Sequence, residues 1–272
     1  RVVLTFAELG RQILRTRAAL ARWDLRRGDI VAGTAGTREV EAALLLAMPA
    51  SSTYAPMASS LDADAYEALL SRLVPRAVVL PAGGAPELDE AARRLGIATI
   101  RVAPSGNPEA PAFELALDRE GSSLARPRRG SADWCYVNAT SGTSGRFKLV
   151  PTTHLQMTFQ ADRMGERLAI VPDDVSAHVT AFPLALGQRT TFVVPILNGA
   201  SIECLDEADV SALARAIDAE RVSYVAASFA IHRELLARFA GRPRPPGGRL
   251  RVAVVNAGRL EAGEVVALEA AL

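Results

Sequence analysis

Short runs of β-branched and aliphatic residues alternate with segments of helical periodicity along this chain, and the alternation limits the folds that it can adopt. The expected strands are DIVAG (29–33), RAVVL (76–80), IATIRV (97–102), WCYVN (134–138), SIECL (201–205), VSYVAA (222–227) and LRVAVV (250–255). A helix is expected before the first strand, where Thr5 and Glu8 have the spacing of a capping box. Strands separated by helices form a largely parallel sheet covered by helices, so the chain is predicted to be an α/β protein.

Composition and charge narrow the classes of partner. The chain has 272 residues, of which 49% are hydrophobic, and this is enough to form one large domain or two lobes. Its 31 basic and 30 acidic residues nearly balance, so neither a nucleic acid nor a membrane is an expected partner. Cys135 and Cys204 are too few for a disulfide framework, and their positions suggest no metal site. No apolar stretch has the length of a membrane span, and the expected location is the cytoplasm.

The segment ATSGTSGRFKLVPTTH, residues 139–154, combines hydroxyl side chains, glycines and one lysine between two expected strands. It is not a nucleotide-binding P-loop, because Phe147 stands directly before Lys148 where that pattern needs glycine. Its groups can still hold phosphate, since glycines let the backbone approach an anion and hydroxyls and a lysine supply donors. The residues concerned are Thr140, Ser141, Gly142, Thr143, Ser144, Gly145 and Lys148. A solvated Ser/Gly turn is the alternative interpretation.

The order of residues in this segment resembles the signature loop of the adenylate-forming superfamily, T-S-G-(S/T)-T-G-x-P-K-G-V followed by T-H. Acyl- and aryl-CoA ligases, luciferases and peptide-synthetase adenylation domains share this loop. Three other stretches resemble the family as well: residues 5–33, 43–80 and 198–236. Phe147 and Leu149 depart from the signature, which has proline and glycine at these positions, so the exit of the loop is expected to be bulkier. His154, of the T-H pair, is expected to cap or pack rather than to react.

The resemblance implies two doubly wound α/β lobes of the large N-terminal domain of an adenylate-forming enzyme, in truncated form. Residues 36–169 would form the first lobe, with the phosphate-binding loop. Residues 1–35 and 170–272 would form the second, incomplete lobe, so that the first helix packs against the later half of the chain. The family's C-terminal domain and its lysine are absent from the sequence, and this fragment alone is expected to be inactive.

The same resemblance implies an ATP-dependent ligase that uses Mg²⁺, converts a small carboxylic acid to an acyl-adenylate and passes it to the thiol of CoA or of an acyl or peptidyl carrier protein. Lys148 and Thr143 would be catalytic, and the loop residues 140–145 and Lys148 would bind ATP. The segment VVNAGRL resembles the family's adenine-binding stretch, which points to Asn256, Ala257 and Gly258. The expected acid-binding residues are Ala185, Leu186, Val225, Ala226 and Ala227.

The expected acid is apolar, because residues 182–188 contain no aspartate to neutralise an α-ammonium group. The sequence selects neither one particular acid nor one thiol acceptor. Two other functions stay open: a noncatalytic binding or docking module with the same fold, and an unrelated α/β protein whose Ser/Gly loop binds another phosphorylated metabolite.

Overall fold

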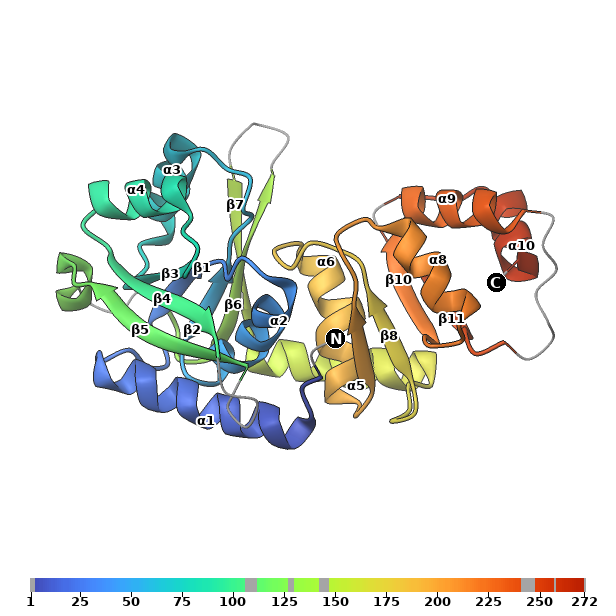
Figure 1. Cartoon of the computed structure of the whole chain (residues 1–272), viewed down its shortest axis with the longest axis horizontal. Coiled ribbons are helices and arrows are strands. Elements are labelled where there is room, and N and C mark those ends of the chain that lie inside the picture. The colour runs from blue at the N-terminus through green and yellow to red at the C-terminus, as the bar shows by residue number, and fades with distance from the viewer. Residues whose placement is uncertain are drawn as a thin grey trace. The chain divides into compact units, whose positions relative to one another are not determined.

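The computed structural model describes residues 3–105, 112–126, 130–141, 147–240, 248–256 and 258–271. Its contacts divide the chain into two compact units, residues 1–155 and 156–272, each with its own sheet (Figure 1). All seven strands expected from the sequence are present, and the α/β class is confirmed. Strand β7 matches the second strand expected at the hydroxyl-rich segment, KLVP (148–151), whereas β2, β5 and β8 lie outside the expected segments.

Unit 1 contains a seven-stranded sheet in the order β5-β4-β3-β1-β2-β6-β7. The pairs within β4-β3-β1-β2-β6 are parallel, and the two edge strands, β5 and β7, are antiparallel to their neighbours. Its strands are β1 (Ile30–Gly33), β2 (Thr53–Pro56), β3 (Ala77–Pro81), β4 (Ala98–Pro104), β5 (Phe113–Arg119), β6 (Trp134–Ser141) and β7 (Phe147–Thr153). Its helices are α1 (Phe6–Arg22), α2 (Arg38–Ala47), α3 (Ala63–Leu73) and α4 (Pro86–Arg94), with short 3₁₀ turns η1 (Met48–Ala50) and η2 (Ser122–Ala125).

Helices cover both faces of this sheet (Figure 1). Apolar side chains of α3 and α4 pack with alternate residues of β1, β3 and β6 in one buried cluster that includes Leu70, Leu88, Val78 and Val137. On the other face, α1 contacts α2, η1 and β5. A parallel sheet that is buried on both faces needs apolar side chains on both, and this explains the uninterrupted apolar runs at β1 and β3.

The first 35 residues belong to unit 1, which differs from the division expected from the sequence. Strand β1 pairs with both β2 and β3 in the interior of the seven-stranded sheet. Helix α1 begins with the expected capping box, and the side-chain carbonyl of its buried Gln12 accepts a hydrogen bond from the backbone N–H of Phe113 in β5. The backbone of an interior strand such as β1 needs a partner strand on each side, and unit 1 provides both. The boundary near residue 155 also precedes the expected one at residue 169.

Unit 2 contains a four-stranded parallel sheet in the order β11-β10-β8-β9. Its strands are β8 (Val175–His178), β9 (Ser201–Cys204), β10 (Tyr224–Ser228) and β11 (Val252–Asn256). Its helices are α5 (His154–Leu168), which begins just before the boundary, α6 (Ala185–Gly187), the π-helix η3 (Gln188–Val193), α7 (Val194–Leu197), α8 (Val210–Asp218), α9 (Phe229–Phe239) and α10 (Ala262–Ala271).

The strand order of unit 2 repeats that of β4-β3-β1-β2 in unit 1, and each first strand is preceded by a buried aspartate. A carboxylate oxygen of Asp29 accepts the backbone N–H of Arg26 at 2.9 Å, and Asp174 accepts that of Val171 at the same distance. Each aspartate also pairs with a distant arginine, Asp29 with Arg76 at 3.0 Å and Asp174 with Arg251 through a 2.9 Å bond. The aspartate therefore closes the turn that leads into the strand and neutralises the arginine.

Removing the charge of Asp174 is expected to destabilise the protein in a pH-dependent manner. Burial raises the pKa of this carboxyl, but hydrogen bonds from Arg251, Val171 and Ser223 lower it further, to about 2. Because the folded-state pKa lies below the unfolded-state value, the stabilisation is complete above about pH 4 and disappears as the pH falls through about 2. Asp174→Asn should therefore lower the unfolding free energy by about 2 kcal/mol at pH 7, and urea unfolding from pH 7 to pH 3 should show that loss shrinking below pH 4. A loss that is independent of pH would contradict this assignment.

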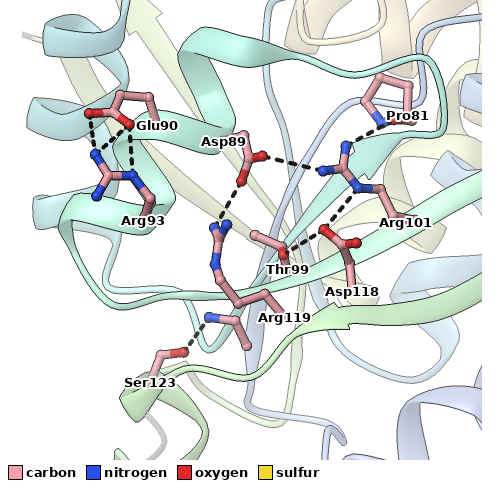
Figure 2. A network of polar contacts seen from close by, with 10 residues as sticks. Pro81, Asp89, Glu90, Arg93, Thr99, Arg101, Asp118, Arg119 and Ser123 are labelled. Carbon is pink, nitrogen blue, oxygen red and sulfur yellow. Dashed lines mark hydrogen bonds and ion pairs between the residues drawn. The ribbon is translucent and has the colours of Figure 1, made fainter.

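Figure 2 shows a second polar network, in which α4 is fixed to strands β4 and β5. Asp89 of α4 lies between two arginines, accepting bonds from Arg101 at 3.3 Å and Arg119 at 2.8 Å. Arg101 also donates to Asp118 of β5 at 2.9 Å. The four side chains are 28–35% exposed, so solvent screens these pairs only in part. The network holds the antiparallel edge strand β5 in place against the parallel part of the sheet.

Replacing Asp89 with alanine is expected to lower the unfolding free energy by about 1–2 kcal/mol, because two partly buried arginines lose a partner. Glu90, the next residue of α4, provides a matched control. It pairs with Arg93 and Arg94, three and four residues later on the exposed surface of the same helix. Glu90→Ala should cost less than about 0.5 kcal/mol. Chemical denaturation of both variants measures the difference, and equal losses would refute the bridging role of Asp89.

Candidate functional site

The two ends of the hydroxyl-rich segment lie on β6 and β7, which pair as an antiparallel hairpin. In its register Thr140 is opposite Lys148 and Ser141 is opposite Phe147. The connecting residues, and with them the predicted site residues Gly142, Thr143, Ser144 and Gly145, lie outside the described part of the chain. Of the predicted phosphate-binding set, the structure therefore locates Thr140, Lys148 and the backbone of Ser141. It brings Thr140 and Lys148 together, as directly opposed residues where the two strands enter and leave the loop.

The two faces of this hairpin have different surroundings. Ala139, Phe147 and Leu149 are partly buried against the cluster formed with α3 and α4. Cross-strand partners share a face and successive residues alternate, so Thr140 and Lys148 lie on the opposite face, where both are exposed. Arg72 of α3 also donates a hydrogen bond to the backbone carbonyl of Phe147.

Phe147 and Leu149 thus have a structural explanation. They depart from the family signature, and both side chains pack on the core side of the hairpin. Packing and the bond from Arg72 hold the exit of the loop, where the signature uses proline and glycine.

The base of the hairpin is fixed by hydrogen bonds between β6 and other elements of unit 1. The hydroxyl of buried Tyr136 donates to the carbonyl of Leu45 at 2.7 Å, and that of Thr53 donates to the carbonyl of Trp134 at 3.2 Å. Burial raises the pKa of Tyr136 well above its ordinary value, so this hydroxyl stays protonated. The strands that carry Thr140 and Lys148 therefore start from a rigid base.

His154 begins α5 directly after β7, and its backbone N–H donates to the carbonyl of Asp133 at 2.9 Å. Burial and the nearby charge of Arg27 lower the pKa of its side chain, which is therefore neutral at neutral pH. Its backbone bond to Asp133 holds the start of α5 at the end of β7.

Lys148 is distinctive in a way that the sequence reasoning missed. The chain contains 31 lysines and arginines, and Lys148 is the one lysine among them; the other 30 are arginines. Lysine places a compact charge on a flexible stem, whereas arginine presents a planar fork. Counting the two residue types separately reveals this signal, which the combined count conceals.

In unit 2, hydroxyl side chains from near the starts of strands β8 and β10 contact the π-helix η3. The hydroxyl of Tyr224 donates to the carbonyl of Thr190 at 3.0 Å, and that of Ser176 donates to the carbonyl of Thr191 at 2.8 Å. A π-helix changes the intrahelical bonding pattern of a continuous helix and is frequent at functional sites. Hydroxyls of β8 and β10 thus satisfy carbonyls of this segment.

An aromatic cluster also contacts the π-helix, through Phe192 of η3 itself. The ring of His178, at the end of β8, stacks on Phe182 with centroids 4.5 Å apart, and Phe192 lies 5.4 Å from both rings. The hydroxyl of Thr191 donates its proton to the carbonyl of Gly187 at 2.8 Å. Nδ1 of His178 lies 2.6 Å from the hydroxyl oxygen of Thr191. Because the hydroxyl proton is already used, Nδ1 carries a proton of its own and donates it to that oxygen. No sequence pattern predicts this arrangement, because the partners lie on separate elements.

The predicted adenine-binding residues are located in part. Asn256, the last residue of β11, donates its side-chain amide to the hydroxyl of Thr190 at 3.2 Å. Gly258 has φ +143°, and a Cβ there would lie 2.1 Å from the ring of Phe229, so this position accepts only glycine. Ala257 lies outside the described residues. The stretch is therefore held against η3 on one side and α9 on the other.

The predicted acid-binding residues fall into two groups. Ala185 and Leu186 form the start of the helix that continues into η3, and Leu186 is 44% exposed. The β10 residues are buried on opposite faces of the sheet: Val225 and Ala227 pack with α8 and α9, whereas Ala226 packs in the cluster that contains Val194. One pocket cannot be lined by all three β10 side chains, so contact of the acid with this strand stays a prediction.

The described ranges contain no group of three or more His, Cys, Asp or Glu side chains arranged to hold a metal ion. Within the same ranges, no helix is long and apolar enough to cross a membrane.

Known proteins share this fold and sequence pattern. A propanoyl:CoA ligase of Rhodococcus jostii (strain RHA1), whose acyl group carries a methyl-dioxo-octahydroindenyl ring system, is 28% identical over 273 residues, covering 94% of this chain and 53% of the relative. ATP-bound MatB from Rhodopseudomonas palustris superposes with a TM-score of 0.77 at 20% identity, covering 98% of this chain and 52% of that chain. Apo MbtA from Mycobacterium smegmatis gives a TM-score of 0.73 at 19% identity, with coverages of 98% and 50%.

The chain spans about half the length of these proteins. The chain thus has the fold that MatB and MbtA share over about half of their length. The family model of AMP-binding enzymes extends over residues 1–271, and on that match the chain belongs to the AMP-binding enzyme family.

Proposed function

We propose that this chain carries the phosphate-binding loop and acid-binding residues of an ATP-dependent ligase that activates a carboxylic acid as its acyl-adenylate and transfers the acyl group to a thiol. The observation that carries the proposal is the β6–β7 hairpin of this chain, which matches the AMP-binding family model. Thr140 and Lys148 are opposed on one exposed face of the hairpin, at the ends of the Ser/Gly segment. In that role Lys148 places its ammonium beside the β- and γ-phosphates, and Thr140 offers a hydroxyl. Both groups offset negative charge on the leaving pyrophosphate.

The acid-binding part of the proposal places an apolar acyl or aryl acid beside Ala185 and Leu186. This segment carries exposed aliphatic side chains, Leu184 at 58% and Leu186 at 44%. Residues 182–188 contain no acidic side chain that could pair with an α-ammonium group. The Rhodococcus ligase, whose name specifies a largely hydrocarbon propanoyl group and CoA, supports an apolar acid and CoA as the thiol to test first. A carrier-protein thiol is the second acceptor to test.

Mg²⁺ enters the proposal as the ion that accompanies the phosphates of ATP. The described residues supply no cluster of carboxylates to hold it, so no step is assigned to the metal. The protein's own part is to orient the phosphates at the hairpin and the acid at α6.

Hydroxylamine trapping of acyl-adenylates tests this function directly. The protein, as its gene encodes it, is incubated with ATP, Mg²⁺ and one acid at a time: octanoate, benzoate, 3-phenylpropanoate, malonate, L-alanine or L-aspartate. We expect hydroxamate formation with one or more of the first three acids and little with the amino acids. A preference for an amino acid would contradict the apolar acid site, and no ATP-dependent product with any acid would contradict the ligase assignment.

A further inference from the structure

Thr190 links the two stretches of unit 2 that the proposed function assigns to nucleotide and to acid. Its hydroxyl oxygen accepts a hydrogen bond from the side-chain amide of Asn256 at 3.2 Å and donates its proton to the carbonyl of Leu186 at 2.8 Å. Asn256 ends β11, and Leu186 lies in the acid-binding segment. Thr190 itself is 3% exposed. One buried hydroxyl therefore receives a bond from one stretch and gives a bond to the other.

The surroundings of Thr190 make this link directional. A hydroxyl has one proton, which is committed to Leu186, so Asn256 must approach as the donor. The backbone carbonyl of Thr190 is held separately by Tyr224 of β10 at 3.0 Å. A displacement of the Asn256 amide therefore acts on the Thr190 hydroxyl while the backbone of the π-helix stays anchored, and the bond to Leu186 responds.

We propose that Thr190 is a positioning residue through which nucleotide bound at Asn256 favours binding of the acid beside Leu186, so that the two substrates bind cooperatively. This inference rests on the proposed function, because it takes the nucleotide and acid positions from it. By thermodynamic linkage the acid raises the affinity for nucleotide by the same factor.

The neighbouring residue supplies a matched control. Thr191 lies in the same π-helix, is fully buried, and makes a similar pair of hydroxyl bonds, from His178 and to Gly187. Its bonds stay within β8 and the α6–η3 helix and do not reach β11. Thr190→Val and Thr191→Val remove the same group from the same helix, but only the first breaks the connection between Asn256 and Leu186. Thr190→Ser restores the hydroxyl.

The test measures the dissociation constant of the panel acid that gives the fastest hydroxamate formation, by calorimetry, with and without saturating α,β-methylene ATP. In the wild type we expect nucleotide to tighten acid binding on the order of fivefold or more. Thr190→Val should reduce this factor below about twofold, whereas Thr190→Ser and Thr191→Val should keep it. If Thr190 has only a structural role, both valine variants should bind the acid more weakly. The factor by which nucleotide tightens acid binding should then fall no more in Thr190→Val than in Thr191→Val.

The outcomes separate the two proposals. If the wild type binds neither nucleotide nor any acid of the panel, the proposed function fails. If both bind but the wild type shows no coupling, or Thr190→Val keeps it, the function stands and the inference about Thr190 is overturned. Loss of the factor in Thr191→Val to the same extent would also overturn it, because the effect would then arise from the helix as a whole.

Discussion

Replacing Lys148 with alanine is expected to lower kcat/KM for ATP in ATP–pyrophosphate exchange by roughly 10- to 100-fold. This corresponds to about 1.4–2.7 kcal/mol, close to the range of a hydrogen bond to a charged group. The side chain is exposed on β7 opposite Thr140, so its removal should leave packing intact and the melting temperature nearly unchanged. Lys148→Arg, which keeps the charge but changes its shape, should recover part of the activity. Unchanged exchange in a Thr143→Ala, Lys148→Ala double variant would contradict the assignment.

The lysine content of the chain offers a second measurement of the same site. Because Lys148 is the one lysine of the 272 residues, an amine-selective reagent has this side chain and the α-amino group as its amine targets in this chain. We expect ATP to slow modification of Lys148, monitored by peptide mass spectrometry, and to leave the α-amino group unaffected as an internal control. Equal protection of both amines, or protection of neither, would argue against phosphate contact at Lys148.

Asp29→Ala is expected to produce the largest loss of stability, about 3–5 kcal/mol in unfolding free energy. The side chain of Asp29 is fully buried and pairs at 3.0 Å with that of Arg76, which is 7% exposed. Removing the carboxylate leaves a buried guanidinium without its main counter-charge, and removes the acceptor for the backbone N–H of Arg26 that closes the turn before β1. Equilibrium denaturation by urea, combined with circular dichroism, measures the loss.

Asp24 supplies the control for this substitution, since it approaches the same arginine at 3.6 Å from a position that is 62% exposed. Asp24 has φ +54°, a conformation that asparagine tolerates well, so Asp24→Asn removes the charge without backbone strain. Its cost should stay below about 1 kcal/mol, in the range of exposed ion pairs. Similar losses for the two variants would show that burial does not determine the strength of the Asp29–Arg76 pair.

The α/β class and most strand positions followed from local pattern, because a strand in a parallel sheet buried on both faces is apolar at every position. Strand β5 is less visible in the sequence because it lies at an edge of the sheet, where its burial alternates along Phe113–Arg119. Strand β8 was missed because its four residues, Val175–His178, include a serine and a histidine that are buried as hydrogen-bonding groups. Their partners lie in the π-helix, which no local pattern predicts.

By itself the sequence determined the phosphate-loop candidate and the family resemblance, since both depend on residue order over a short span. Tertiary structure decided which unit residues 1–35 join, because β1 must find partner strands on both sides and these come from residues 53–56 and 77–79. It also decided that Thr190 lies between Asn256 and Leu186. Hydrogen bonds between residues 66 positions apart depend on how strands stack into a sheet, and spacing along the chain does not encode that distance.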